Sequence, residues 1–93
     1  MRKRGKTDGN QSDIVAALRQ VGAHVTILSN VGGGVPDLLV ARHGKLFLVE
    51  CKSETGKLTA DELAYVNEIS RVVLVAVRIV RSPEAALRAI DAI

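Results

Sequence analysis

The most constraining feature of the chain is the segment VPDLLVARHGKLFLVECKS, residues 35–53, in which two apolar runs flank a His-Gly pair. Such runs around a short turn are typical of the two strands of a β-hairpin. Asp37, Glu50 and Lys52 interrupt these runs with charge. A charged group that faces a protein interior is unfavourable unless it is paired or binds a metal ion. The hairpin therefore predicts that these three side chains have specific partners.

The turn decides which residues of the hairpin face one another. With His43 and Gly44 as a two-residue turn, Asp37 falls directly opposite Glu50. Facing residues in antiparallel strands have Cβ atoms about 4.5–5.5 Å apart. A three-residue turn would shift the register by one residue and place Asp37 opposite a neighbour of Glu50 instead. The two-residue turn predicts a carboxylate pair, and strand alternation adds Lys52 to the same face.

The expected carboxylate pair needs a cation or a shared proton, because two facing carboxylates repel each other. Mg²⁺ prefers oxygen ligands and suits such a pair. In an alternative interpretation, Asp37 caps a strand end while Glu50 and Lys52 form an ion pair at the surface. The presence of all three charges in one hairpin favours the metal site.

Helix, strand and turn signals alternate along the chain. Ser12 is a candidate N-cap for a first helix that ends at Gly22. Thr59 and Glu62 match a capping box, which predicts a second helix from about Ala60. The expected strands are residues 24–29, 37–42, 45–52 and 72–80, and a last helix opens at Ser82-Pro83.

The order of these elements predicts an α/β fold. The strand-helix-strand unit from residue 46 to residue 80 implies a right-handed parallel crossover, and the first three strands can form an antiparallel meander. The run 72–80 is so continuously apolar that we expect a strand buried on both faces. The sequence therefore predicts a mixed four-stranded sheet flanked by helices, with a further helix at the C-terminus.

The length of 93 residues leaves room for one core, so we expect a single domain over residues 12–93. Residues 1–11 are polar and form a basic arm. Four of the 13 Lys and Arg residues lie within residues 1–6, so from residue 7 onward nine basic residues face ten acidic residues. Such an arm suits a polyanion such as nucleic acid, and a solvated tail is an equal alternative. The basic residues of the arm are Arg2, Lys3, Arg4 and Lys6.

Several classes of protein are disfavoured by composition. No run of 18 apolar residues occurs, so we expect no membrane span, and the basic N-terminus lacks the apolar segment of a secretory signal. A single cysteine, Cys51, excludes an internal disulfide and a Cys/His zinc site, and fits a cytoplasmic location. Aromatic residues make up 2% of the chain, which disfavours a single-strand-binding module that stacks bases.

The pattern Pro36-Asp37, followed after the hairpin by Glu50-Cys51-Lys52, resembles the PD-(D/E)XK nuclease superfamily. It is most similar to the VRR-Nuc branch, including small stand-alone versions from bacteriophages that resemble Holliday-junction resolvases. The resemblance covers nearly the whole chain from Asp8 and implies a restriction-endonuclease-like αβββαβ core. The resembling segments are DGNQSDIVAALRQVGAHV, VGGGVPDLLVARHGKLFLVECKS, GKLTADE and RSPEAALRAI.

This resemblance implies a structure-selective endonuclease that hydrolyses DNA phosphodiesters with Mg²⁺ or Mn²⁺. By the match of motifs, Asp37 and Glu50 would bind the metal and the backbone carbonyl of Cys51 would supply a further ligand. Lys52 would orient or help deprotonate the attacking water. Asp13 matches the place where the first helix of these nucleases often contributes another catalytic acid.

The resemblance also implies partners. The substrate would be DNA, with Holliday junctions or other branched DNA expected, and small relatives form homodimers. A bacterial cytoplasm, with a phage origin, is the expected setting. A catalytically silent DNA-binding or assembly module of the same fold is the alternative. The residues expected to bind nucleic acid are Arg2, Lys3, Arg4, Lys6, Gln11 and Lys57.

Overall fold

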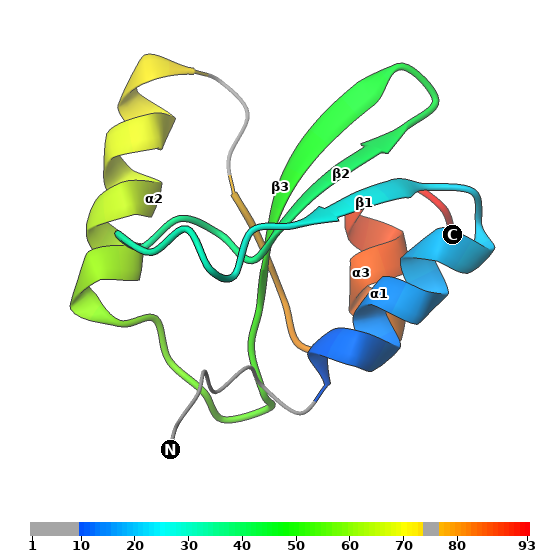
Figure 1. Cartoon of the computed structure of the whole chain (residues 1–93), viewed down its shortest axis with the longest axis horizontal. Coiled ribbons are helices and arrows are strands. Elements are labelled where there is room, and N and C mark those ends of the chain that lie inside the picture. Colours follow the sequence, from blue (N-terminus) through cyan, green and yellow to red (C-terminus); the bar gives the residue numbers. More distant parts are fainter. Residues whose placement is uncertain (1–9, 74–76) are drawn as a thin grey trace.

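The computed structural model describes residues 10–73 and 77–93, which form an α/β fold (Figure 1). The four expected basic residues of the arm lie outside the described residues. The elements, in chain order, are α1 (Gln11–Gln20), β1 (His24–Ile27), β2 (Leu38–Arg42), β3 (Lys45–Cys51), α2 (Ala60–Val72), β4 (Arg78–Val80) and α3 (Pro83–Ala89).

The four strands form one mixed sheet in the order β1-β2-β3-β4. β1, β2 and β3 are antiparallel neighbours, and β4 runs parallel to β3 after the α2 crossover. In the β2–β3 hairpin, Arg42 faces Lys45 and Leu38 faces Val49. His43 and Gly44 have φ angles of 51° and 79°, which is the left-handed backbone that a two-residue hairpin turn needs. The predicted mixed sheet and the two-residue turn are confirmed.

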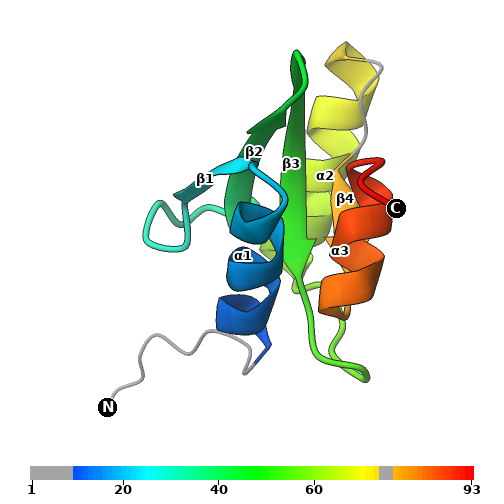
Figure 2. The same ribbon diagram turned by 90° about the vertical axis from the view of Figure 1, so that its right-hand side faces the viewer.

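Helices cover both faces of the sheet. α1 and α3 pack side by side on one face, and α2 lies on the other (Figures 1 and 2). Every second residue of β2 and β3 points into the core, where it joins the apolar stripe of α1. This alternation is expected for a sheet with one packed face. The most deeply buried side chains are Ile14, Leu18, Leu38, Val40, Val49 and Pro36. The residues of β2 and β3 that lie between these core positions, including Glu50, therefore point to the opposite face of the sheet, which α2 covers.

The start of α1 differs from the prediction. The helix begins at Gln11 rather than after Ser12, and the N–H of Ile14 donates to the carbonyl of Asn10 at 3.0 Å. Asn10 is therefore the N-cap, although its side chain makes no capping hydrogen bond. The expectation of Ser12 as the cap is wrong because the helical hydrogen bonds start two residues earlier, and Gln11 belongs to the helix rather than to the arm.

The last strand also differs from the prediction. Val72 is the final residue of α2, and β4 spans three residues, Arg78–Val80. Residues 74–76 lie outside the described residues. β4 is an edge strand in which Ile79 is 41% exposed, so the expectation of a strand buried on both faces is wrong. A buried strand and a helix end followed by an edge strand can have the same apolar run, so the sequence pattern alone does not separate them.

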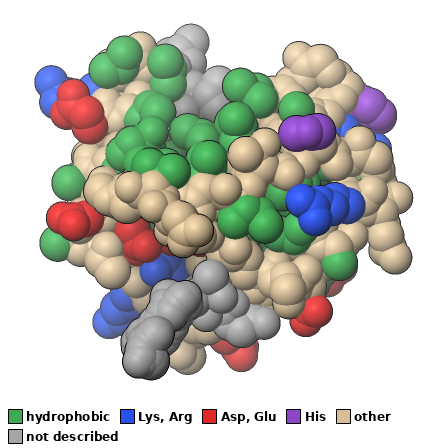
Figure 3. Space-filling view, in the orientation of Figure 1, with side chains coloured by type: hydrophobic (Ala, Val, Ile, Leu, Met, Phe, Trp, Pro, Cys, Tyr) green, Lys and Arg blue, Asp and Glu red, His purple; other side chains and the backbone are tan. Residues whose placement is uncertain are grey.

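The face covered by α2 is packed less tightly than the other face. No residue of α2 is buried, and Val72 is 73% exposed. A cavity of about 290 Å³ lies between α2 and the hairpin, where Ile69 approaches Leu39 and Leu48. Figure 3 shows hydrophobic side chains gathered over this part of the molecule. None of the helices in the described ranges is long and apolar enough to cross a bilayer.

Candidate functional site

The structure brings Asp37 and Glu50 together at the open end of the hairpin. Asp37 precedes β2, and its carbonyl accepts a hydrogen bond from the N–H of Leu28 at 2.6 Å. Its carboxylate accepts the backbone N–H of Cys51, with 2.8 Å between N and Oδ2. The side chains of Asp37 and Glu50 lie within hydrogen-bonding reach of each other. The hairpin register therefore produces the carboxylate pair that the sequence predicts.

Glu50 is the buried member of this pair, with 3% of its surface exposed. Burial raises the pKa of its carboxyl group to about 8, and the nearby charges of Asp37 and Glu62 add to the shift. Burial also raises the pKa of Asp37, although the hydrogen bonds with Cys51 and Glu50 act to lower it. Both pKa values are raised because negative charge is concentrated here with little solvent to stabilise it. Such a site favours either a proton or a cation.

Lys52 supplies the positive charge at this site. Its side chain is 12% exposed, and its Nζ lies 3.7 Å from Oε2 of Glu50. A second acid, Glu62, is closer, with 2.8 Å between Nζ of Lys52 and Oε1 of Glu62. The ammonium group is therefore shared between two carboxylates, and the stronger contact is to the residue from α2.

Glu62 is the site residue that the sequence did not predict. It is the third residue of α2, where it completes the capping box: the N–H of Thr59 donates to Oε1 of Glu62 at 2.9 Å, and the N–H of Glu62 donates to Oγ1 of Thr59 at 3.1 Å. Partial burial acts to raise its pKa, but the hydrogen bonds from Lys52 and Thr59 outweigh burial and lower it. The sequence pattern indicates only the capping role of Glu62, and its contact with Lys52 has no local sequence signal.

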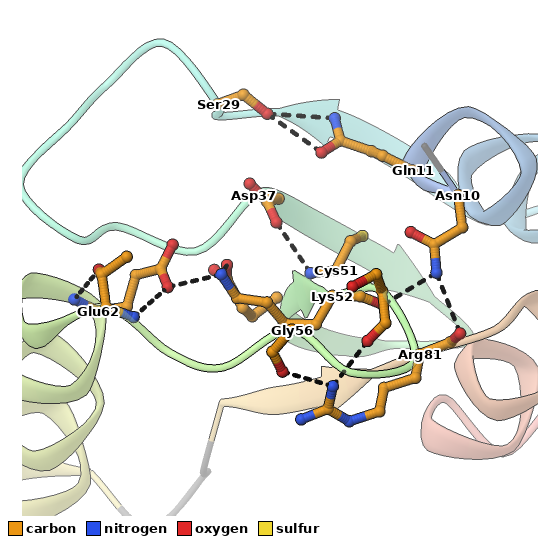
Figure 4. A network of polar contacts seen from close by, with 12 residues as sticks. Asn10, Gln11, Ser29, Asp37, Cys51, Lys52, Gly56, Glu62 and Arg81 are labelled. Atoms are coloured by element: carbon orange, nitrogen blue, oxygen red, sulfur yellow. Dashed lines mark hydrogen bonds and ion pairs between the residues drawn. The ribbon is translucent and has the colours of Figure 1, made fainter. Parts of the chain in front are cut away.

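Two further residues that the sequence did not single out hold the backbone around Lys52 (Figure 4). Nδ2 of Asn10 donates to the carbonyls of Lys52 at 2.9 Å and Arg81 at 3.0 Å. The guanidinium of Arg81 donates to the carbonyls of Ser53 and Gly56, each at 2.7 Å. These bonds join the start of α1, the end of β3 and the end of β4 into one support.

The glycine-rich loop before β2, NVGGG at residues 30–34, contacts α2. Gly34 has φ of 81°, and a Cβ placed on it would collide with the backbone carbonyl of Asp61 in the first turn of α2. Gly32 and Gly33 have open space around them. Gly34 therefore allows the loop before Asp37 and the helix start that carries Glu62 to approach each other.

The other predicted site residues are placed less favourably. Gln11 is buried, and its amide is hydrogen-bonded to Oγ of Ser29 at 3.1 Å. Asp13 is exposed on α1, and among the described residues no hydrogen bond or ion pair joins it to Asp37 or Glu50. Lys57 is exposed in the loop between β3 and α2. The roles proposed for Gln11, Asp13 and Lys57 remain predictions.

The donor groups at the site fit a hard divalent cation with few protein ligands. Across residues 10–73 and 77–93, no set of three or more His, Cys, Asp or Glu side chains is arranged to hold a metal ion. Asp37 and Glu50 nevertheless offer two adjacent carboxyl groups, and Mg²⁺ commonly binds through one or two carboxylates while keeping several waters. The thiol of Cys51 is buried in the core, so this residue could contribute only its backbone carbonyl.

Comparison of the sequence with models of known protein families gives no match, and a search of curated proteins finds no similar sequence.

Proposed function

We propose that the protein is a metal-dependent DNA endonuclease of the PD-(D/E)XK type, with a restriction-endonuclease-like core of VRR-Nuc character. The observation that carries this proposal is the convergence of Asp37, Glu50 and Lys52 at one end of a hairpin. Burial raises the pKa of Glu50 to about 8, and the nearby charges of Asp37 and Glu62 add to the shift against the single ammonium group of Lys52. A bound dication would supply further positive charge.

Each residue has a task in phosphodiester hydrolysis. A bound Mg²⁺ or Mn²⁺ would acidify water and polarise a phosphoryl oxygen. Asp37 and Glu50 would hold the cation, with the carbonyl of Cys51 as a further ligand. Lys52, the nearest described cation to Glu50, would orient the attacking water and offset charge on the scissile phosphate. Glu50 lies in β3, and Asp37 and Lys52 directly flank β2 and β3. The sheet therefore holds the three groups near one another before substrate binds.

The substrate and the assembly are proposed from the sequence resemblance. The substrate is DNA, with branched or Holliday-junction DNA preferred, and the active form is a homodimer. The basic arm and Lys57 bind the phosphate backbone without reading sequence. Gln11 and Asp13 are proposed as further contributors from the first helix.

A second candidate function is a DNA-binding or assembly module that does not cut. The lack of a third metal-binding side chain in the described part of the chain favours this alternative. This alternative assigns no function to the buried carboxyl group of Glu50, whereas the metal-dependent nuclease does.

Nicking of supercoiled plasmid in Mg²⁺ or Mn²⁺ separates the two candidates. The wild-type protein should nick, whereas Lys52→Ala and Asp37→Asn should lower the rate by about 100-fold or more. The matched control is Lys45→Ala, because Lys45 is the first residue of the strand that ends just before Lys52 but forms an exposed ion pair with Asp91 at 3.5 Å. Equal nicking by all variants would indicate a contaminant and remove the nuclease proposal.

Two further measurements test the substrate and the assembly. A panel of four-way, flap and linear DNA, cut under one metal condition, should show a preference for branched DNA. The mass in solution, with and without branched DNA, should correspond to two copies of the chain. Equal cutting of all substrates would contradict structure selectivity, and a monomer under both conditions would contradict the homodimer.

A further inference from the structure

We infer that Glu62 is a positioning residue, which holds the Lys52 ammonium away from Glu50 and so keeps the Glu50 carboxylate available to a divalent cation. This inference rests on the proposed metal-dependent function and extends it to a residue outside the motif. It gives α2 a role in the site that none of the motif residues reveals.

The geometry shows two acids competing for one ammonium group. Lys52 follows Glu50 by two residues on the same face of the chain, so the nearest acid along the strand is Glu50. Yet Nζ lies 2.8 Å from Glu62 and 3.7 Å from Glu50. The shorter distance is that of a charge-assisted hydrogen bond, and the longer one is a weaker ionic contact. Glu62 therefore takes the stronger contact with Lys52.

Glu62 can hold Lys52 because its own position is fixed from two sides. The capping box ties its carboxylate to the N–H of Thr59 and its N–H to the Thr59 hydroxyl. The next residue toward the N-terminus, Asp61, has its carbonyl against Gly34, so the helix start is seated on the glycine-rich loop. The exposed fractions of the Lys52 and Glu62 side chains are 12% and 20%, which limits competition from water.

Removal of Glu62 would let Lys52 turn to Glu50. The distance between Nζ and Oε2 of Glu50 would need to shorten from 3.7 Å to about 2.7–2.9 Å for a direct hydrogen bond. A lysine bonded to Glu50 would neutralise the charge that attracts a dication and would occupy one of its ligand atoms. Glu62 thus affects cation binding through Lys52. Its carboxyl group also lies within hydrogen-bonding reach of Glu50, so this route has to be separated from a direct effect on Glu50.

A double-mutant cycle with Mn²⁺ alone as the probe tests this route on the full-length chain. The four proteins are wild type, Glu62→Ala, Lys52→Ala and the double variant, and Mn²⁺ affinity is measured by electron paramagnetic resonance. Glu62→Ala should weaken Mn²⁺ binding about tenfold in the wild-type background, as expected for coupled members of one ionic network. In the Lys52→Ala background, the same change should weaken binding by less than about twofold. Equal weakening in both backgrounds would overturn the inference, because Glu62 would then act on the cation directly.

Two variants separate this role from helix capping. Thr59→Ala removes the hydroxyl that accepts the N–H of Glu62 but keeps the N–H that binds its carboxylate. It should lower stability and leave Mn²⁺ affinity within about twofold of wild type. Weakening as large as that of Glu62→Ala would overturn the inference in favour of a capping effect. Glu62→Gln keeps a capping oxygen without the charge and should weaken Mn²⁺ binding in the same direction as Glu62→Ala.

A readout without metal follows from the same geometry. The side-chain ammonium signal of Lys52 in nitrogen-detected NMR should be protected from solvent exchange in wild type and in Thr59→Ala. It should keep its position in Thr59→Ala and shift in Glu62→Ala; an unshifted signal in Glu62→Ala would overturn the inference. Failure of wild type to bind Mn²⁺ would overturn the proposed function, whereas Mn²⁺ binding without coupling between Glu62 and Lys52 would overturn the inference alone.

Discussion

The buried carboxyl of Glu50 predicts an unusual dependence of stability on pH. In metal-free protein its pKa is raised from 4.5 to about 8, mainly by burial. The folded state therefore binds a proton in a range where the unfolded state has released it, so the free energy of unfolding should fall as pH rises. The substitution Glu50→Gln, which cannot ionise, should remove this dependence.

The size of the effect follows from the shift. A raised pKa gives stability that is fully present below about pH 4.5 and is lost as the pH rises toward 8. Between about pH 5.5 and 7.5, the loss attributable to Glu50 is about 2–2.5 kcal/mol at 1.36 kcal/mol per unit. Asp37 also has a raised pKa and acts in the same direction. Glu62, whose pKa is lowered from 4.5, contributes stability that is lost in more acidic solution, outside this window.

Urea unfolding in the presence of a chelator measures this effect. The unfolding free energy of Glu50→Gln minus that of wild type should grow by about 2–2.5 kcal/mol between about pH 5.5 and 7.5. Added Mg²⁺ at pH 8 should stabilise wild type more than Glu50→Gln, because a dication that binds the folded state alone stabilises it. A constant difference across this pH range would refute the reasoning, since Glu50 would then ionise normally in the fold.

Three other substitutions test the support of the site. Gly34→Ala should destabilise the fold by at least about 2 kcal/mol in urea unfolding, because it strains a positive φ and collides with Asp61; an unchanged midpoint would contradict that close approach. Leu18→Ala empties a fully buried core position and should cost about 2–5 kcal/mol by the same assay, and a loss below about 1 kcal/mol would mean that α1 is loosely packed. In Arg81→Lys, the ammonium group cannot replace the guanidinium that binds the carbonyls of Ser53 and Gly56. Amide hydrogen exchange should therefore become faster in residues 53–58, and unchanged exchange would show that other contacts hold this loop.

The hairpin and its carboxylate pair could be predicted because local chemistry determines them. His43 and Gly44 both adopt positive φ, which fixes the loop length and therefore the register. Once the register is fixed, the proximity of Asp37 and Glu50 follows from strand geometry alone. The helix that begins at Ala60 was predictable for the same reason, since Thr59 and Glu62 form a capping box within one turn.

The remaining features depend on contacts between distant segments. The pairing of Glu62 with Lys52 requires α2 to begin beside the end of β3, which no local pattern specifies. Asn10 bonds to carbonyls 42 and 71 residues away, so its preference for long-range partners over helix capping could not be foreseen. The exposure of Ile79 depends on which strand ends the sheet, and an apolar run gives no information about that.

The buried thiol of Cys51 can be used to measure local opening at the end of β3. Its sulfur is shielded by the core, with 2% of the residue exposed, while its backbone N–H binds the carboxylate of Asp37. A thiol reagent can react with it only when the end of β3 separates from the helices beneath, because alkylation requires an accessible thiolate. Labelling kinetics under native conditions would therefore report how often the strand that carries Glu50 opens, without the introduction of any foreign group beforehand.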